Sequence, residues 1–223
     1  MAASSSHVRT VIPALNILPK DTPSNLYASN VAHFSSIPWT AALLRQPATV
    51  PFIPMCRNPG DAQHDQFFGN TLSNERGIPH MLSFFTRTDQ NIRDPDTPVT
   101  KASTLFQLGH GVTGGPSILH GGMTMAMVDE AMCSIPELNH VLGKNGASFT
   151  GLSVTGMLDI KFLKPVFVGR AVIATAWLEG AEGRKTRVRC EVRDEDGLEL
   201  ARCSSTWVTA RPTGVFLAEK AKI

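Results

Sequence analysis

The sequence predicts an α+β domain in which an antiparallel sheet wraps around one buried helix. Residues 123–134 form an apolar stretch with methionines on nearly all helical faces, which is typical of a helix buried on every side. Strand-like runs follow it at 150–162, 171–178, 184–193 and 198–210. Because these runs follow one another after a single helix, they predict an antiparallel meander that covers it.

Composition indicates an ordinary globular chain. It has 223 residues, 42% hydrophobic and 18% charged, with a formal net charge of +2. At this length roughly 70% of the surface of the unfolded chain can be buried, so no disulfide or metal staple is needed. The small net charge argues against nucleic-acid binding, and the longest apolar runs are shorter than a membrane span.

Four scattered cysteines, at 56, 133, 190 and 203, form no disulfide framework and no Cys-x-x-Cys pair, so we expect a reducing compartment, the cytoplasm. Residues 1–20 hold no acidic residue and include three consecutive serines, which keeps mitochondrial import as the alternative. The histidines show no metal-ligand spacing, and we expect no metal or other cofactor.

Prolines divide the chain near residue 98. Residues 1–98 hold 11 of the 15 prolines, and such a density opposes long helices and central strands. We therefore expect an irregular N-terminal extension that packs on the core, a main domain at 99–212 and a C-terminal tail at 213–223. Within the extension, residues 39–44 predict a short helix and 80–88 a strand.

The segments around the buried helix follow in order. Residues 103–108 predict a short strand, 109–122 a glycine-rich loop, and 136–148 a loop that begins at a proline. The glycine pattern of 109–114 matches G-x-G-x-x-G, but further glycines and Pro116 delay the helix, which argues against dinucleotide binding. Residues 151–155 lack the last glycine of a nucleophile elbow, so a serine hydrolase is not expected.

The last two strands can be aligned by their turn. A two-residue hairpin at Asp196-Gly197 makes the numbers of paired residues sum to 393. This register places Glu191 opposite Arg202 as an ion pair and Cys190 opposite Cys203. Cross-strand Cβ separations exceed relaxed disulfide geometry, so we expect both cysteines to be reduced core residues.

The start of the buried helix carries the features that point to chemistry. Gly121 and Gly122 offer bare amides at the positive end of the helix dipole, where a developing oxyanion can be bound. Asp129, inside the same helix, is costly to bury unless it has a polar partner or faces a cleft. The two features lie roughly 10 Å apart at 1.5 Å per residue, so a dimer that shares its sites would bring them to one carbonyl.

These residues carry a resemblance. The sequence His120-Gly121-Gly122 followed by Asp129, the run 154–165 (VTGMLDIKFLKP) and the turn 182–185 (EGRK) resemble the hotdog-fold acyl-CoA thioesterases of the PaaI and THEM type. The resemblance covers approximately residues 103–210. It implies a hotdog fold, an antiparallel sheet around one long helix, assembled as a homodimer or a dimer of dimers with active sites at the interface.

The resemblance also implies roles for site residues. The Gly122 amide would polarise the thioester carbonyl, and Asp129 of the other protomer would act as general base or nucleophile, assisted by Thr155. His120 would orient the loop or the sulfur side. Helical neighbours point about 100° apart, so we expect Asp129 to face the cleft and Glu130 to point away. Gly121 would be a substrate contact on the loop, and the contacts to CoA would come from Lys161, Leu163, Arg184 and Lys185.

The predicted function is hydrolysis of an acyl-CoA thioester to a carboxylic acid and CoA. Residues 161–193 hold eight basic and three glutamate residues, which suits either CoA phosphates or a solvated sheet face. Three alternatives stay open: release of an acyl or polyketide chain from an acyl-carrier protein, a hotdog hydratase or dehydratase, and a noncatalytic acyl-binding protein. A hydratase would need an Asp and His pair, and this chain offers no clear second partner.

Overall fold

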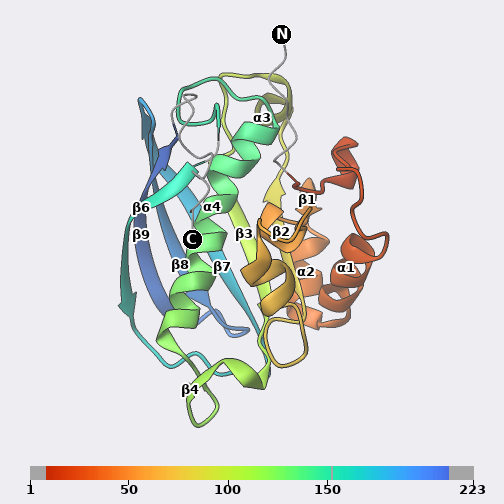
Figure 1. Ribbon diagram of the computed structural model, residues 1–223, viewed down its shortest axis with the longest axis vertical. Helices are drawn as coiled ribbons and strands as arrows, with labels where there is room; N and C mark the ends of the chain where they lie inside the picture. Colours follow the sequence, from red (N-terminus) through yellow and green to blue (C-terminus); the bar gives the residue numbers. More distant parts are fainter. Residues whose placement is uncertain (1–8, 152, 211–223) are drawn as a thin grey trace, which may run out of the picture.

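Seven antiparallel strands form the main sheet in the part of the chain that the computed structural model describes, residues 9–151 and 153–210 (Figure 1). Their order is β1-β2-β3-β7-β8-β9-β6, which places β6 at one edge. A small ribbon of β4 and β5 precedes the long helix. The strands are β1 (Thr49–Phe52), β2 (Met81–Thr86), β3 (Lys101–Gln107), β4 (Thr113–Gly115), β5 (Ile118–Leu119), β6 (Ser153–Phe162), β7 (Ala171–Glu182), β8 (Lys185–Arg193) and β9 (Glu199–Thr209).

The helix α4 (Gly121–Val141) crosses one face of this sheet, where Figure 1 shows it in green over β3, β7 and β8. Met127, Val128 and Met132 are fully buried against the strands, because the helix presents apolar side chains in nearly every direction. One long helix wrapped by an antiparallel sheet is the hotdog arrangement, and the predicted fold class is confirmed.

The helix is longer than the sequence indicated at both ends. Gly121 and Gly122, expected in the glycine-rich loop, form its first turn. The loop expected from Pro136 was also wrong, since α4 continues through Pro136 to Val141. Tertiary contacts offset the backbone hydrogen bond that proline removes. Buried Asn139 holds this last part in place by accepting from Val99 N at 2.7 Å and donating to Val99 O at 2.9 Å.

The opposite face of the sheet is covered by the N-terminal part of the chain. Leu82 of β2 is paired with Leu105 of β3 and packs in a second apolar cluster with Phe34, while neighbouring strand residues face α4. The helices of this part are α1 (Leu26–Ser36), α2 (Pro38–Leu44) and α3 (Asp89–Arg93), with short helical turns at Pro13–Leu15, Met55–Arg57, Phe67–Thr71 and, farther on, His110–Val112.

The expectation of an irregular N-terminal extension was therefore wrong for residues 9–98, although the short helix and the strand predicted there are present as α2 and β2. The sheet continues into this part of the chain despite its prolines. Pro51 lies in β1, a four-residue strand at the edge of the sheet opposite β6, and an edge strand tolerates the loss of the backbone N–H donor that proline lacks. The predicted tail at 213–223 and residues 1–8 of the transit-like segment lie outside the described residues.

The last hairpin has the predicted register from Lys185 to Val192, but the predicted two-residue turn at Asp196-Gly197 was wrong. The register shifts by one residue at Arg193, which pairs with Glu199, and Gly197 N donates to the Asp194 carbonyl at 3.1 Å. Cys190 pairs with Cys203 and Glu191 with Arg202, and both cysteines are free and buried. The predicted ion pair across the strands was wrong: Glu191 binds Arg193 at 2.8 Å on its own strand, and Arg202 binds Glu199 at 2.8 Å. Glu191 and Arg193 are alternate residues that share a face of β8, whereas Glu199 lies three positions before Arg202, beside the register shift at the start of β9.

Candidate active site

His120 caps the start of α4 through its side chain. Its Nδ1 accepts a hydrogen bond of 3.0 Å from the backbone N of Gly122, which satisfies one of the free amides of the first turn. The Gly122 amide, expected to polarise a carbonyl, therefore has a partner in its own chain. A Cβ atom at Gly122 would lie 3.1 Å from His120 Nδ1, so glycine lets the ring approach this closely.

Gly121 lies in a shallow pocket of about 310 Å³ between the first turn of α4 and the segment after β6. Leu163 lines the same pocket, and the Phe162 ring lies 3.5 Å from the position of a Cβ atom at Gly121. The structure thus brings Gly121 and Leu163 together, as expected of two substrate contacts. The remaining lining residues are Ile118, Leu119, Thr124, Lys164, Pro165 and Val166.

Asp129 and Thr155 form the second part of the site. The Thr155 hydroxyl donates a hydrogen bond of 2.8 Å to Oδ1 of Asp129, which joins α4 to the edge strand β6. Burial raises the pKa of Asp129, and the Thr155 hydrogen bond opposes this by favouring the carboxylate. This is the contact that the resemblance implied, between two residues 26 positions apart.

Both residues line a pocket of about 290 Å³. Glu130 lines it too, so the expectation that only one of the two carboxylates faces the cleft was wrong. The pocket extends around α4, from β6 on one side to the segment around Met55 on the other, and therefore accepts two side chains about 100° apart. Burial raises the pKa of Glu130 to about 8, helped by the negative charges of Asp129 and Glu137.

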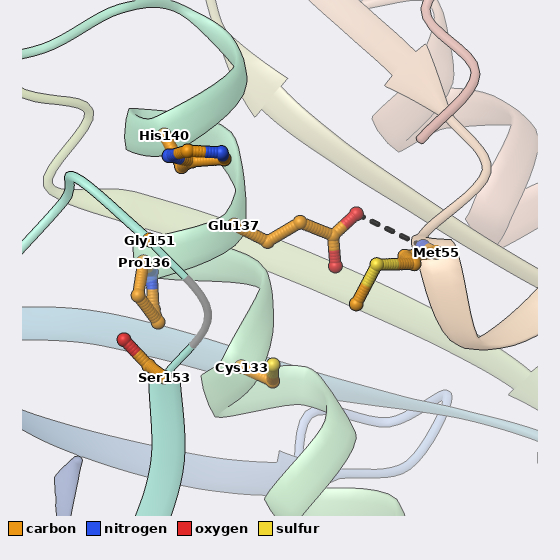
Figure 2. A pocket seen from close by; sticks show the side chains of 7 residues that line it. All are labelled: Met55, Cys133, Pro136, Glu137, His140, Gly151 and Ser153. Atoms are coloured by element: carbon orange, nitrogen blue, oxygen red, sulfur yellow. Dashed lines mark hydrogen bonds between the residues drawn. The ribbon is translucent and has the colours of Figure 1, made fainter. Parts of the chain in front are cut away.

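The N-terminal part supplies one wall of this pocket, which the sequence did not indicate. Met55, Cys56 and Asp65 line it opposite α4. Glu137 holds this wall to the helix. Its Oε1 accepts a hydrogen bond of 2.5 Å from the Thr10 hydroxyl and one of 2.9 Å from the backbone N of Met55. The hydrogen bond to Met55 is drawn in Figure 2. These partners are 127 and 82 residues away from Glu137, so only the folded chain shows the wall.

A small cavity of about 30 Å³ adjoins the pocket and shares Met55, Cys133, Glu137 and Ser153 with it. Figure 2 shows Glu137 reaching from α4 toward Met55, with His140 one turn farther along the helix. The His140 ring is held by the Phe149 carbonyl, 2.8 Å from Nδ1. The site thus continues from Asp129 along α4 into the molecule.

The expected CoA-binding cations are spread over the surface. Arg184 and Lys185 lie at the β7–β8 turn, in a hollow of about 400 Å³ that Arg187 also lines. Arg184 Nη1 donates to the Thr209 carbonyl at 2.7 Å, which fixes its direction. Lys161 is exposed on β6 and lines none of the hollows described above. Leu163 and the two turn cations therefore lie in separate hollows of one chain.

Within one chain, the described residues do not form a complete hydrolase site. Gly121 and Asp129 line different pockets, and the Gly122 amide is occupied by His120. This agrees with the spacing along α4, which keeps the helix start and the carboxylate apart. Residues 9–151 and 153–210 include no group of three or more His, Cys, Asp or Glu arranged to hold a metal ion, and no helix there has the length and apolar character to cross a membrane.

Part of the chain is similar to known proteins. Residues 117–201, which include every expected site residue, match the family described as the thioesterase superfamily. Verlamelin biosynthesis protein B of Lecanicillium sp is 28% identical over 175 residues, 69% of this chain and 76% of that protein. Acyl-coenzyme A thioesterase THEM4 of Bos taurus is 34% identical over 92 residues, 41% of this chain.

The match covers only 33% of the length of that THEM4 protein. Among solved structures, the PaaI protein of E. coli superposes with a TM-score of 0.41 and 19% identity, over 50% of this chain and 73% of that one. The fold assignment rests on the course of α4 and the sheet described above, together with the family match.

Proposed function

Because residues 117–201 belong to the hotdog-fold thioesterase superfamily, we propose that the chain hydrolyses an acyl-CoA thioester to a carboxylic acid and CoA. The observation that carries this proposal is the Thr155–Asp129 hydrogen bond at the mouth of a pocket. It holds a carboxylate in a partly dry place where a thioester and a water molecule can meet. The name of the THEM4 relatives supports CoA as the thiol.

The carboxylate of Asp129 removes a proton from water, and the resulting hydroxide adds to the thioester carbonyl carbon. The tetrahedral intermediate then collapses, the C–S bond breaks, and the thiolate takes the proton from Asp129. In the alternative route, Asp129 itself attacks and water hydrolyses the anhydride. A single turnover in ¹⁸O-labelled water tests the second route, because ¹⁸O enters the Asp129 carboxylate only when water attacks the Asp129 carbon of the anhydride.

The Gly122 amide stabilises the oxyanion in this proposal, and the His120 ring must leave it when substrate binds. The two parts of the site come from two protomers. The edge strand β6 supports such a dimer, since Val154, Met157 and Phe162 are 41, 54 and 51% exposed on it. Unpaired edge strands with apolar side chains favour association.

Arg184 and Lys185 bind CoA phosphates in this proposal, with Lys161 and Leu163 along the path from the surface to the site. A carrier-protein thioester is the second candidate. The cations around the hollow at the β7–β8 turn, Arg184, Lys185 and Arg187, could serve it too, because an acidic carrier domain suits a basic surface; Arg189 is already paired with Glu191 at 3.0 Å. A noncatalytic acyl-binding protein is disfavoured by the polar Thr155–Asp129 pair, which binding of an alkyl chain alone does not need.

The test is a thiol-release assay with short, long and aromatic acyl-CoAs and with an acyl-carrier-protein thioester. We expect CoA release that falls by at least about a hundredfold in Asp129→Asn, with the fold retained. Release from the carrier protein alone supports the second candidate. If no thiol is released from either substrate class, both hydrolase candidates are contradicted, and the noncatalytic acyl-binding protein is the candidate that is left.

A further inference from the structure

We propose that the pocket beside Asp129 selects an acyl chain with a neutral oxygen substituent, a hydroxyl or keto group, to which the Glu130 carboxyl group donates a hydrogen bond. This inference rests on the proposed thioester hydrolysis and names the class of acyl group. It starts from the polarity of the pocket. Asp65, Glu130 and Glu137 line it together with Cys56 and Cys133, beside the apolar side chains of Met55, Val154 and Trp207.

An unsubstituted alkyl chain suits the apolar part of this wall but leaves its polar groups without partners. Carboxyl and thiol groups that face a hydrocarbon lose the hydrogen bonds they make with water, and this loss opposes binding. Sites built to hydrogen-bond a substrate group reject analogues that lack it much more strongly than apolar pockets reject an added methylene. Glu137 serves to anchor the N-terminal wall, but a plain fatty acyl chain offers no partner to the Glu130 carboxyl group.

Glu130 is the group with hydrogen-bonding capacity to spare. Its one recorded side-chain partner is the Cys56 thiol, which is a weak hydrogen-bonding group. Glu137, in contrast, accepts from both Thr10 and Met55 and acts as the anchor of the N-terminal wall. Of these two carboxyl groups, Glu130 is therefore the one left to a ligand.

The surroundings of Glu130 keep it in its neutral, donating form. The titratable groups that affect it are the acids Asp129, Asp65 and Glu137 and the Cys56 thiol, and no Lys or Arg is among the residues lining the pocket. Burial raises its pKa to about 8, so near pH 7 it carries a proton and can donate to an oxygen acceptor. Asp129, which must be ionised in the proposed reaction, repels an anionic acyl group, so we expect the substituent to be neutral.

The position of Glu130 limits where the oxygen lies on the chain. Glu130 is adjacent to Asp129, which holds the water that attacks the thioester carbon in the proposed reaction. Glu137 follows two helical turns later, about 12 Å along α4 from Asp129. We therefore expect the substituent within the first several carbons after the thioester, before the chain reaches the Glu137 anchor.

The experiment compares acyl-CoAs of one length. Octanoyl-CoA, 3-hydroxy-, 3-keto- and 5-hydroxyoctanoyl-CoA and the anionic suberyl-CoA are assayed by CoA release, and kcat/KM is determined for each. We expect at least one oxygenated neutral chain to exceed octanoyl-CoA by about tenfold or more, with suberyl-CoA the poorest. Equal values for octanoyl and all oxygenated chains overturn this inference and leave the proposed function intact. No hydrolysis of any ester contradicts the proposed function instead.

Variants separate a binding role from a structural one. Glu130→Leu should lose the preference for the oxygenated chain: kcat/KM should rise for octanoyl-CoA and fall for the preferred oxygenated acyl-CoA. A general loss of folding would lower both values and cannot produce these opposite changes. Glu130→Gln still donates a hydrogen bond and should keep the preference even above pH 8, where the wild-type preference declines as Glu130 ionises. Glu137→Gln is the matched control and should keep the preference for the oxygenated chain near pH 7. An unchanged ratio in a folded Glu130→Leu protein overturns the inference.

Discussion

The Thr155 hydroxyl donates a hydrogen bond of 2.8 Å to Oδ1 of Asp129. This contact joins the buried helix α4 to the edge strand β6 and sets the direction of the carboxylate at the mouth of the pocket. It also acts on the proton affinity of Asp129, since the bond favours the charged form while burial favours the neutral one. Substitution of Thr155 therefore tests both the direction of the Asp129 carboxylate and its pKa.

Thr155→Val should lower kcat about tenfold near pH 7 and move the acid limb of the pH–rate profile to higher pH. Asp129 must be ionised to act, and loss of the hydroxyl raises its pKa because the carboxylate loses a donor. Steady-state assays from pH 4 to 8 measure both effects. Thr155→Ser keeps the hydroxyl and should stay close to wild type, whereas an unmoved limb in Thr155→Val contradicts the role.

Lys185→Glu should raise KM for an acyl-CoA several-fold and leave KM unchanged for the acyl-pantetheine thioester, which lacks the nucleotide phosphates. The reason is that the hollow at the β7–β8 turn gathers three cations, Arg184, Lys185 and Arg187, which match phosphate charges. The comparison of the two substrates isolates the phosphate contact from any change in the fold. If both KM values rise together, the hollow is not a phosphate site.

Met157→Lys should convert the proposed dimer into monomers and abolish hydrolysis at the same protein concentrations. Met157 is 54% exposed beside the irregular pairing of β6 with β9, on the free edge of the described sheet. A charge there opposes edge pairing. Analytical ultracentrifugation and the thiol assay on the same samples check the coupling. Full activity in a proven monomer would rule out a shared site.

The free energy of unfolding should fall as pH rises from about 5 to 8. Burial raises the pKa of Glu137 to about 7 and of Glu130 to about 8, so in this range these two carboxyl groups bind more protons in the folded state than in the unfolded state; the lowered pKa of His80 opposes this only in the acidic part of the range. Each group then costs at most about 1.4 kcal/mol per pH unit. Urea titrations at several pH values measure the slope. The slope should flatten in Glu130→Gln/Glu137→Gln, and stability that increases with pH refutes the assignment.

His120→Ala should lower the free energy of unfolding by about 1 kcal/mol, because the Gly122 amide loses its capping acceptor. His120→Asn provides the control, since asparagine is a good N-cap residue and should restore most of the loss. Urea denaturation of the three proteins gives the comparison. Equal stability of the alanine and asparagine variants means that the side-chain cap contributes little.

Much of the fold could be read from local pattern. Alternating residues indicated the β8–β9 register, and Cys190 does face Cys203, although the register shifts by one residue at Arg193 and the turn runs from Asp194 to Gly197. The resemblance also pointed to the Thr155–Asp129 pair, although the roles of these residues stay predictions. Pattern failed for Pro136, because a proline ends most helices and the contacts that retain this one come from Val99, far along the chain.

By itself, then, the sequence determined the buried helix, the strands that wrap it and the identity of the polar residues that interrupt its apolar surface. These follow from periodicity and turn chemistry, which act over a few residues. Only the tertiary structure decided that Glu130 shares the pocket with Asp129 and that the proline-rich half supplies its wall. Burial and long-range hydrogen bonds such as that from Thr10 to Glu137 exist only after the chain has folded, so no local pattern encodes them.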